Sequence, residues 1–109
     1  MMNFSQDAFI DEMQSRTEVS VGREACMKLR HATVGIAGFG GVGALATELL
    51  ARAGVGHFRL LDMDVYDVSN LNRQVFANSE TLGRPKAEVA AERIKSINPY
   101  AEIQKILVQ

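Results

Sequence analysis

The most constraining feature of this 109-residue chain is a glycine-rich turn between two short apolar runs, within TVGIAGFGGVGALATELLARAGVGHFRLLD. The segment predicts a strand at Thr33–Ala37, a helix at Val42–Ala53 and a second strand at Phe58–Asp62. The apolar runs lack clean alternation, which predicts a parallel sheet with both faces covered. The order of elements therefore predicts an α/β fold with a Rossmann-like parallel sheet.

The spacing Gly38-x-Gly40-x-x-Gly43 indicates what this turn is built to do. It places glycine where the turn is tight, where the backbone must approach a phosphate, and where the helix must pack closely on the strand. Asp62 follows about twenty residues later, the distance expected for an acid that binds ribose hydroxyls. The pattern predicts a nucleotide site; the alternative is a glycine turn that only lets a helix pack against a sheet.

The flanking sequence predicts three more helices and a third strand. Periodicity and the prolines place them at Asn3–Met13, Ser20–Arg30, Pro85–Ile97 and, for the strand, Ile103–Val108. We expect residues 1–30 to form N-terminal helices and residues 31–109 to form the βαβαβ N-terminal half of a truncated Rossmann-like domain. Right-handed crossovers then give the strand order 3-2-1, with the strand Thr33–Ala37 at an edge. An apolar edge of this kind invites another chain.

Composition limits the possible partners. A hydrophobic content of 47% suffices for a packed core, and a net charge of -1 argues against a general nucleic-acid or membrane surface. The chain has no long apolar run and no basic leader at its start, so we expect a cytoplasmic protein. Its single cysteine, Cys26, excludes an internal disulfide and is predicted to pack in a helix rather than to react. No zinc-binding cysteine pair is present.

A dense polar series follows the second strand and favours one nucleotide chemistry over another. It comprises Asp62, Asp64, Asn70, Asn72, Arg73, Gln74 and Lys86. An NAD(P)-binding oxidoreductase module needs one ribose acid and then apolar surface, whereas ATP needs cations that neutralise charge as pyrophosphate leaves. The series therefore favours ATP, with NAD(P) as the alternative. The alternative for Arg73 and Lys86 is a pair of solvated surface charges.

The runs G-x-G-G-x-G, LLDMDVYDVSNLNRQ, GRPKAE and INPY together resemble the adenylating enzymes of the ThiF/MoeB family, relatives of the ubiquitin-activating enzymes. The resemblance extends from Arg16 to the last strand, and ARAGVGHFRLLDMD further resembles the thiamine-biosynthesis branch. It implies an ATP- and Mg²⁺-dependent adenylyltransferase that activates the C-terminal glycine carboxylate of a ubiquitin-like sulfur carrier protein. It also implies a homodimer.

The resemblance implies a role for each matching residue. The nucleotide would lie against the backbone of the glycine turn, and Asp62 would bind the ribose. Phosphate binding would fall to Asn70 and to two residues that also act in catalysis, Arg73 and Lys86. The four glycines of the turn are Gly38, Gly40, Gly41 and Gly43.

Two further assignments stay open. Asp64 would either help to position magnesium or cap the following turn. Arg16 matches an arginine that reaches the ATP of the neighbouring subunit, and the alternative is a plain surface arginine. The family's later magnesium-binding aspartate and second half-sheet would follow Gln109, so we expect this piece to bind nucleotide weakly and to be inactive by itself.

Overall fold

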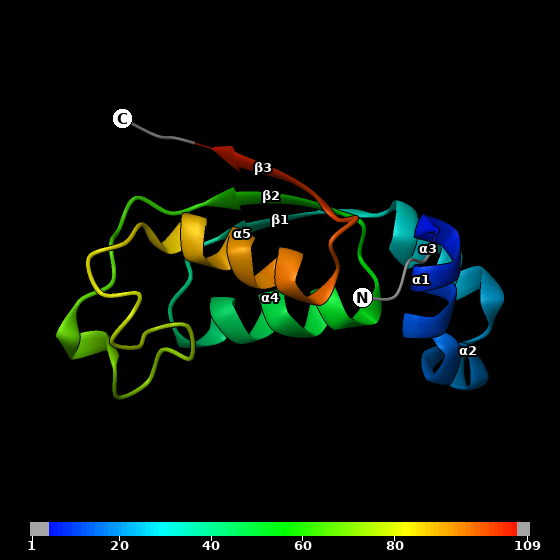
Figure 1. Ribbon diagram of the computed structural model, residues 1–109, viewed down its shortest axis with the longest axis horizontal. Coiled ribbons are helices and arrows are strands. Elements are labelled where there is room, and N and C mark those ends of the chain that lie inside the picture. The colour runs from blue at the N-terminus through cyan, green and yellow to red at the C-terminus, as the bar shows by residue number, and fades with distance from the viewer. Residues whose placement is uncertain (1–4, 107–109) are drawn as a thin grey trace.

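The computed structural model describes residues 5–106 and has a parallel three-stranded sheet at its centre (Figure 1). The strands are β1 (Thr33–Ala37), β2 (His57–Leu61) and β3 (Glu102–Ile106), in the order β1-β2-β3. The predicted strand order is confirmed, with β1 at an edge. The predicted strand Phe58–Asp62 is displaced by one residue, because the Asp62 side chain bonds to the loop that follows β1. The last two residues of the predicted third strand lie outside the described residues.

Two helices, α4 (Gly41–Ala53) and α5 (Lys86–Ile97), pack against the same face of the sheet (Figure 1). Strand residues meet small helix residues in this core, which includes Ile36, Phe58, Leu60, Ala44, Ala51, Ala90 and Ile94. The opposite face is not covered by the described residues, and Gly35 and Arg59 are exposed on it. The prediction that both faces are covered is therefore wrong for this part of the chain, because two crossovers of the same hand place both helices on one side.

Three short helices precede the sheet and gather at the end where its strands begin (Figure 1). They are α1 (Gln6–Met13), α2 (Ser15–Val21) and α3 (Arg23–His31). The predicted single helix Ser20–Arg30 is wrong: the chain breaks at Gly22, whose φ of 88° does not belong to a right-handed helix. Of the predicted helix Asn3–Met13, the structure shows Gln6–Met13, with Ser5 as the N-cap residue, and Asn3 and Phe4 lie outside the described residues.

Buried polar contacts fasten these helices to the rest of the chain. Gln14 is fully buried, and its Nε2 donates to the carbonyl oxygens of Cys26 at 3.2 Å and Ala53 at 3.0 Å. Arg30 Nε donates to Gln14 Oε1 at 2.6 Å, and Arg30 Nη2 donates to Asp11 at 2.5 Å. Cys26 is fully buried, in agreement with the predicted packing role.

A long loop joins β2 to α5 at the other end of the sheet (Figure 1). It contains one short 3-10 helix, η1 (Val68–Asn70), and Pro85 stands just before α5 begins. Within the described residues, no helix is both long and apolar enough to cross a membrane.

Candidate nucleotide site

The glycine turn connects β1 to α4 and has the geometry that its spacing predicts. Gly38 has a φ of +89°, a conformation that L side chains rarely adopt. A Cβ atom on Gly43 would lie 1.9 Å from the carbonyl oxygen of Gly38, so no side chain fits where α4 crosses the end of β1. The predicted tight turn and close helix packing are both confirmed.

The N-terminus of α4 is uncapped. Gly40 is the N-cap residue and supplies no side chain, and the amide groups of residues 41–43 have no acceptor among the described residues. Free amide groups and the positive end of the helix dipole attract an anion. The start of this 13-residue helix is therefore suited to a phosphate.

Asp62 lies directly after β2 and contacts the turn. Its Oδ2 accepts the backbone N–H of Phe39 at 2.8 Å, and its Oδ1 accepts that of Asp64 at 2.7 Å. The carboxylate thus joins the β1–α4 turn to the start of the long loop. A carboxylate oxygen accepts more than one hydrogen bond, so ribose hydroxyls can still bind there.

Asn70 and Asp67 stabilise η1 between them. Asp67 Oδ2 accepts the N–H of Ser69 at 3.0 Å, and Asn70 Oδ1 accepts the N–H of Asp67 at 2.9 Å. Asn70 is buried, and its Nδ2 donates to no described residue. The capping alternative for Asp64 is wrong: Asp67 caps this turn, and the Asp64 carboxylate bonds to no described residue.

The segment after η1 lies against the glycine turn. A Cβ on Gly41 would be 3.3 Å from the carbonyl oxygen of Arg73, and one on Gly40 would be 3.9 Å from Nε2 of the buried Gln74. Arg73 Nη1 donates to the carbonyl oxygen of Ser69 at 3.0 Å. In the described part of the chain, no carboxylate pairs with this exposed guanidinium.

Lys86 is the first residue of α5 and is only 7% exposed. Its backbone N–H donates to the carbonyl oxygen of Asp64 at 3.0 Å, which brings α5 to the end of β2. Its Nζ lies 5.4 Å from the centroid of the Tyr66 ring, and no carboxylate within residues 5–106 forms an ion pair with it. Burial, and then the Asp62 charge, raise the pKa of Tyr66 to about 12, so its phenol stays neutral.

The structure separates Arg16 from this group. Arg16 is exposed on α2, at the end of the sheet opposite to the glycine turn (Figure 1). It therefore does not reach the site of its own chain. The other predicted site residues lie around the turn, η1 and the start of α5.

Sequence reasoning missed Tyr66 as part of the site. The only signal was an aromatic residue within a polar series.

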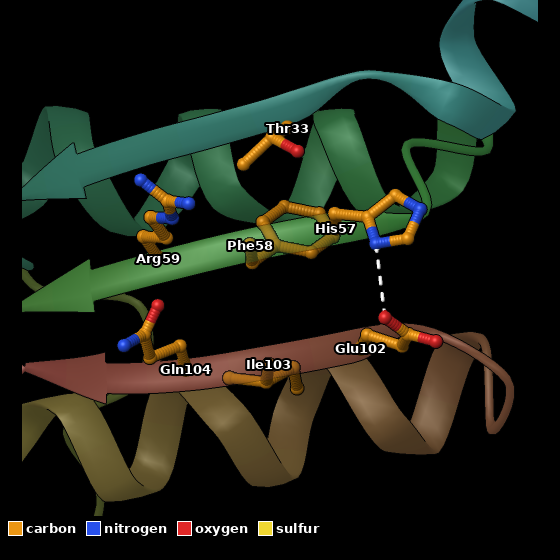
Figure 2. Close-up of a pocket in the computed structure, with 7 residues that line it drawn as sticks. All are labelled: Thr33, His57, Phe58, Arg59, Glu102, Ile103 and Gln104. Carbon is orange, nitrogen blue, oxygen red and sulfur yellow. Dashed lines mark ion pairs between the residues drawn. The ribbon is translucent and has the colours of Figure 1, made fainter.

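A shallow cavity of about 250 Å³ lies elsewhere, on the uncovered sheet face (Figure 2). There His57 Nδ1 pairs with Glu102 Oε2 at 3.2 Å, and no predicted site residue lines the cavity. Among the described residues, no group of three or more His, Cys, Asp or Glu could hold a metal ion.

Comparison with known proteins identifies the family. The profile of the ThiF family matches residues 14–108. The chain belongs to the ThiF family. This ThiF-family chain is 45% identical over 89 residues to the tRNA threonylcarbamoyladenosine dehydratase of Bacillus subtilis, covering 82% of the chain and 35% of the relative. It is 40% identical over 84 residues to the sulfur carrier protein adenylyltransferase of Thermus thermophilus, covering 77% of the chain and 31% of the relative.

Solved structures agree with this assignment. The E. coli tRNA N6-threonylcarbamoyladenosine dehydratase, TcdA, in complex with AMP superposes with a TM-score of 0.87 at 37% identity, over 97% of this ThiF-family chain and 43% of that one. The same enzyme in complex with ATP gives a TM-score of 0.85 at 40% identity, over 88% and 40% of the two chains. The Rossmann-like fold is confirmed, and both of these neighbouring structures contain an adenine nucleotide. The chain spans less than half the length of these relatives.

Proposed function

We propose that this chain supplies the ATP-binding half of an adenylyltransferase that activates a substrate carboxylate as an acyl-adenylate. One observation carries the proposal: the uncapped start of α4 lies against the loop at Arg73, and neither Arg73 nor Lys86, which begins α5 after that loop, has a carboxylate partner among the described residues. No described carboxylate neutralises the Lys86 ammonium, so its charge is available to an incoming phosphate. A polyphosphate supplies that missing charge.

In this proposal the site residues have separate tasks. The triphosphate lies over the α4 N-terminus, against Gly38, Gly40, Gly41 and Gly43, and Asp62 accepts hydrogen bonds from the ribose. Asn70 donates through Nδ2, and the two cations hold the phosphates while the carboxylate attacks the α-phosphorus and pyrophosphate leaves.

Magnesium would contribute charge neutralisation when it binds with ATP. Asp64 is the residue predicted to help position magnesium, and its carboxylate bonds to no described residue. Mg²⁺ commonly binds to one or two carboxylates together with phosphate oxygens. The described residues contain no complete metal-binding group, so the remaining ligands would come from ATP, water or another part of the protein.

The relatives favour a substrate different from the one that the sequence predicts. The matched relatives are named for threonylcarbamoyladenosine in tRNA and for a sulfur carrier protein. In sequence, the tRNA threonylcarbamoyladenosine dehydratase of Haemophilus influenzae aligns over 96% of this chain, whereas the Thermus adenylyltransferase aligns over 77%. We therefore favour a tRNA-linked carboxylate, against the predicted absence of a nucleic-acid partner.

The sulfur carrier carboxylate is the second candidate, and the thiamine branch is one version of it. Both substrates present a carboxylate to the same phosphate-binding site, so the proposed chemistry is shared.

We further propose that Arg16 acts in the site of a second copy of the chain, as in a homodimer. Its exposure at the end of the molecule far from its own site supports this role.

The test uses the full-length protein and ATP–pyrophosphate exchange. Arg73→Ala and Lys86→Ala should each lose about 2.7 to 4 kcal/mol of transition-state stabilisation, the effect of removing one electrostatic contact. Lys95→Ala is the matched control, because Lys95 is an exposed lysine on α5 whose Nζ, among the described residues, donates only to the Pro99 carbonyl oxygen. Exchange close to wild type in both site variants would refute the proposal.

The substrate is tested by adding each candidate separately. A tRNA that carries threonylcarbamoyladenosine should stimulate exchange more than a sulfur carrier protein with a C-terminal glycine. Stimulation by the carrier alone would return the assignment to the sulfur-transfer class. Turnover of NAD(H) by the protein, with no ATP–pyrophosphate exchange, would contradict adenylation.

A further inference from the structure

The Lys86 ammonium has no carboxylate partner among the described residues, so another group must hold it in place. A lysine ammonium is strongly hydrated, and a buried one is normally paired with a carboxylate. Lys86 is 7% exposed as a whole residue, and no carboxylate among residues 5–106 pairs with its ammonium. The face of the Tyr66 ring lies beside that ammonium, 5.4 Å from Nζ to the ring centroid.

A ring face and a carboxylate act differently on a buried cation. A carboxylate neutralises the ammonium and competes with phosphate for it. The quadrupole of an aromatic ring attracts the cation and leaves its charge in place. A lysine intended for a phosphate is therefore better held by a ring than by an acid.

The ring is itself fixed by its backbone. The N–H of Tyr66 donates to the carbonyl oxygen of Arg84 at 3.0 Å, and the carbonyl oxygen of Tyr66 accepts the N–H of Gly83 at 2.8 Å. Tyr66 also forms a parallel bridge with Leu82, and its side chain is 1% exposed. These bonds join the segment that carries the ring to the segment that leads into Lys86. They therefore fix the positions of the two residues relative to each other.

We propose that Tyr66 is a positioning residue, whose ring holds the Lys86 ammonium in place and leaves its charge free for the nucleotide phosphates. The proposal rests on the proposed function, because it requires that Lys86 bind ATP. The phenol hydroxyl has no part in it. The Tyr66 hydroxyl is buried and has no hydrogen-bond partner among the described residues, so the ring alone supplies the contact.

The experiment measures the dissociation constant for ATP on the full-length protein by calorimetry. Tyr66→Phe keeps the ring and should leave the constant close to wild type. Tyr66→Leu removes the ring face and should raise the constant roughly tenfold, between the values for an exposed and a desolvated cation–π contact. Phe58→Leu is the matched control: Phe58 is also 1% exposed, but no cation lies over its ring in the described part of the chain.

A double-mutant cycle separates positioning from a general loss of packing. In a Lys86→Met background, Tyr66→Leu should weaken ATP binding no further, because the group that the ring holds is already gone. Additive effects, or a Tyr66→Leu variant that binds ATP like wild type, would overturn the proposal. If Lys86→Met itself binds ATP normally, the proposed function fails at Lys86, and that outcome is distinct from a failure of Tyr66 alone.

Discussion

Replacing Asp62 by alanine should destabilise the protein even without nucleotide, and the structure sets the size of the effect. The variant leaves two backbone N–H groups without their acceptor, those of Phe39 and Asp64. Phe39 is fully buried, so its N–H cannot turn to water, and an unsatisfied buried donor costs about 1 to 3 kcal/mol. Asp64 is exposed and can bond to water, so the loss there is about 0.5 to 1.5 kcal/mol.

The free energy of unfolding should therefore fall by about 1.5 to 4.5 kcal/mol in Asp62→Ala, measured by urea denaturation without ATP. Asp64→Ala is the matched control. It removes the same charge at a position two residues later, and the Asp64 carboxylate bonds to no described residue. It should change stability by less than about 0.5 kcal/mol. Equal stability of the two variants would refute the view that Asp62 fastens the glycine turn to the long loop.

Three further outcomes are expected. Asp62→Ala should weaken ATP binding and narrow the preference for ATP over 2′-deoxy-ATP, and an unchanged preference would mean that another group binds the ribose. Gly43→Ala should prevent or strongly impair folding, because its Cβ would lie 1.9 Å from a backbone oxygen, while Gly35→Ala, with no atom within 4 Å, should fold normally by circular dichroism. The Arg93 guanidinium holds the pKa of the Glu48 carboxyl below 4.5, so this pair stabilises the fold above that pH. Its contribution should vanish as the pH falls through the lowered pKa, and Arg93→Ala, compared with wild type by urea denaturation at a series of pH values, should lose that acid-sensitive part.

The β1–α4 unit was predictable because its determinants are local. Gly38 and Gly43 are needed for one turn and one close approach, and both depend on residues within a few positions of each other. The strand order also followed, since the crossover rule leaves few arrangements for three parallel strands. The break at Gly22 was missed because the apolar periodicity continues through it, and only a backbone dihedral angle reveals two helices.

The faces of the sheet were predicted less well, for a reason that lies outside the segment. Apolar composition in β1 predicted cover on both sides, yet α4 and α5 both lie on one side. Composition reports what a strand is suited to touch, whereas the direction of each crossover decides where its helix goes. A pattern confined to one strand cannot contain that second piece of information.

The long loop shows why the site could be predicted in its residue types but not in its arrangement. Lys86 lies about twenty residues from Asp64 in sequence, and no periodic pattern joins them. They meet because the N–H of Lys86 donates to the Asp64 carbonyl oxygen, and because Tyr66 bonds to Arg84 just before α5 begins. These bonds place the start of α5 beside the end of β2, where Asp62 already holds the glycine turn. Backbone pairing within the loop thus positions Lys86, the cation proposed to bind phosphate. A change that breaks this pairing should weaken ATP binding without altering any of the proposed ATP-binding residues.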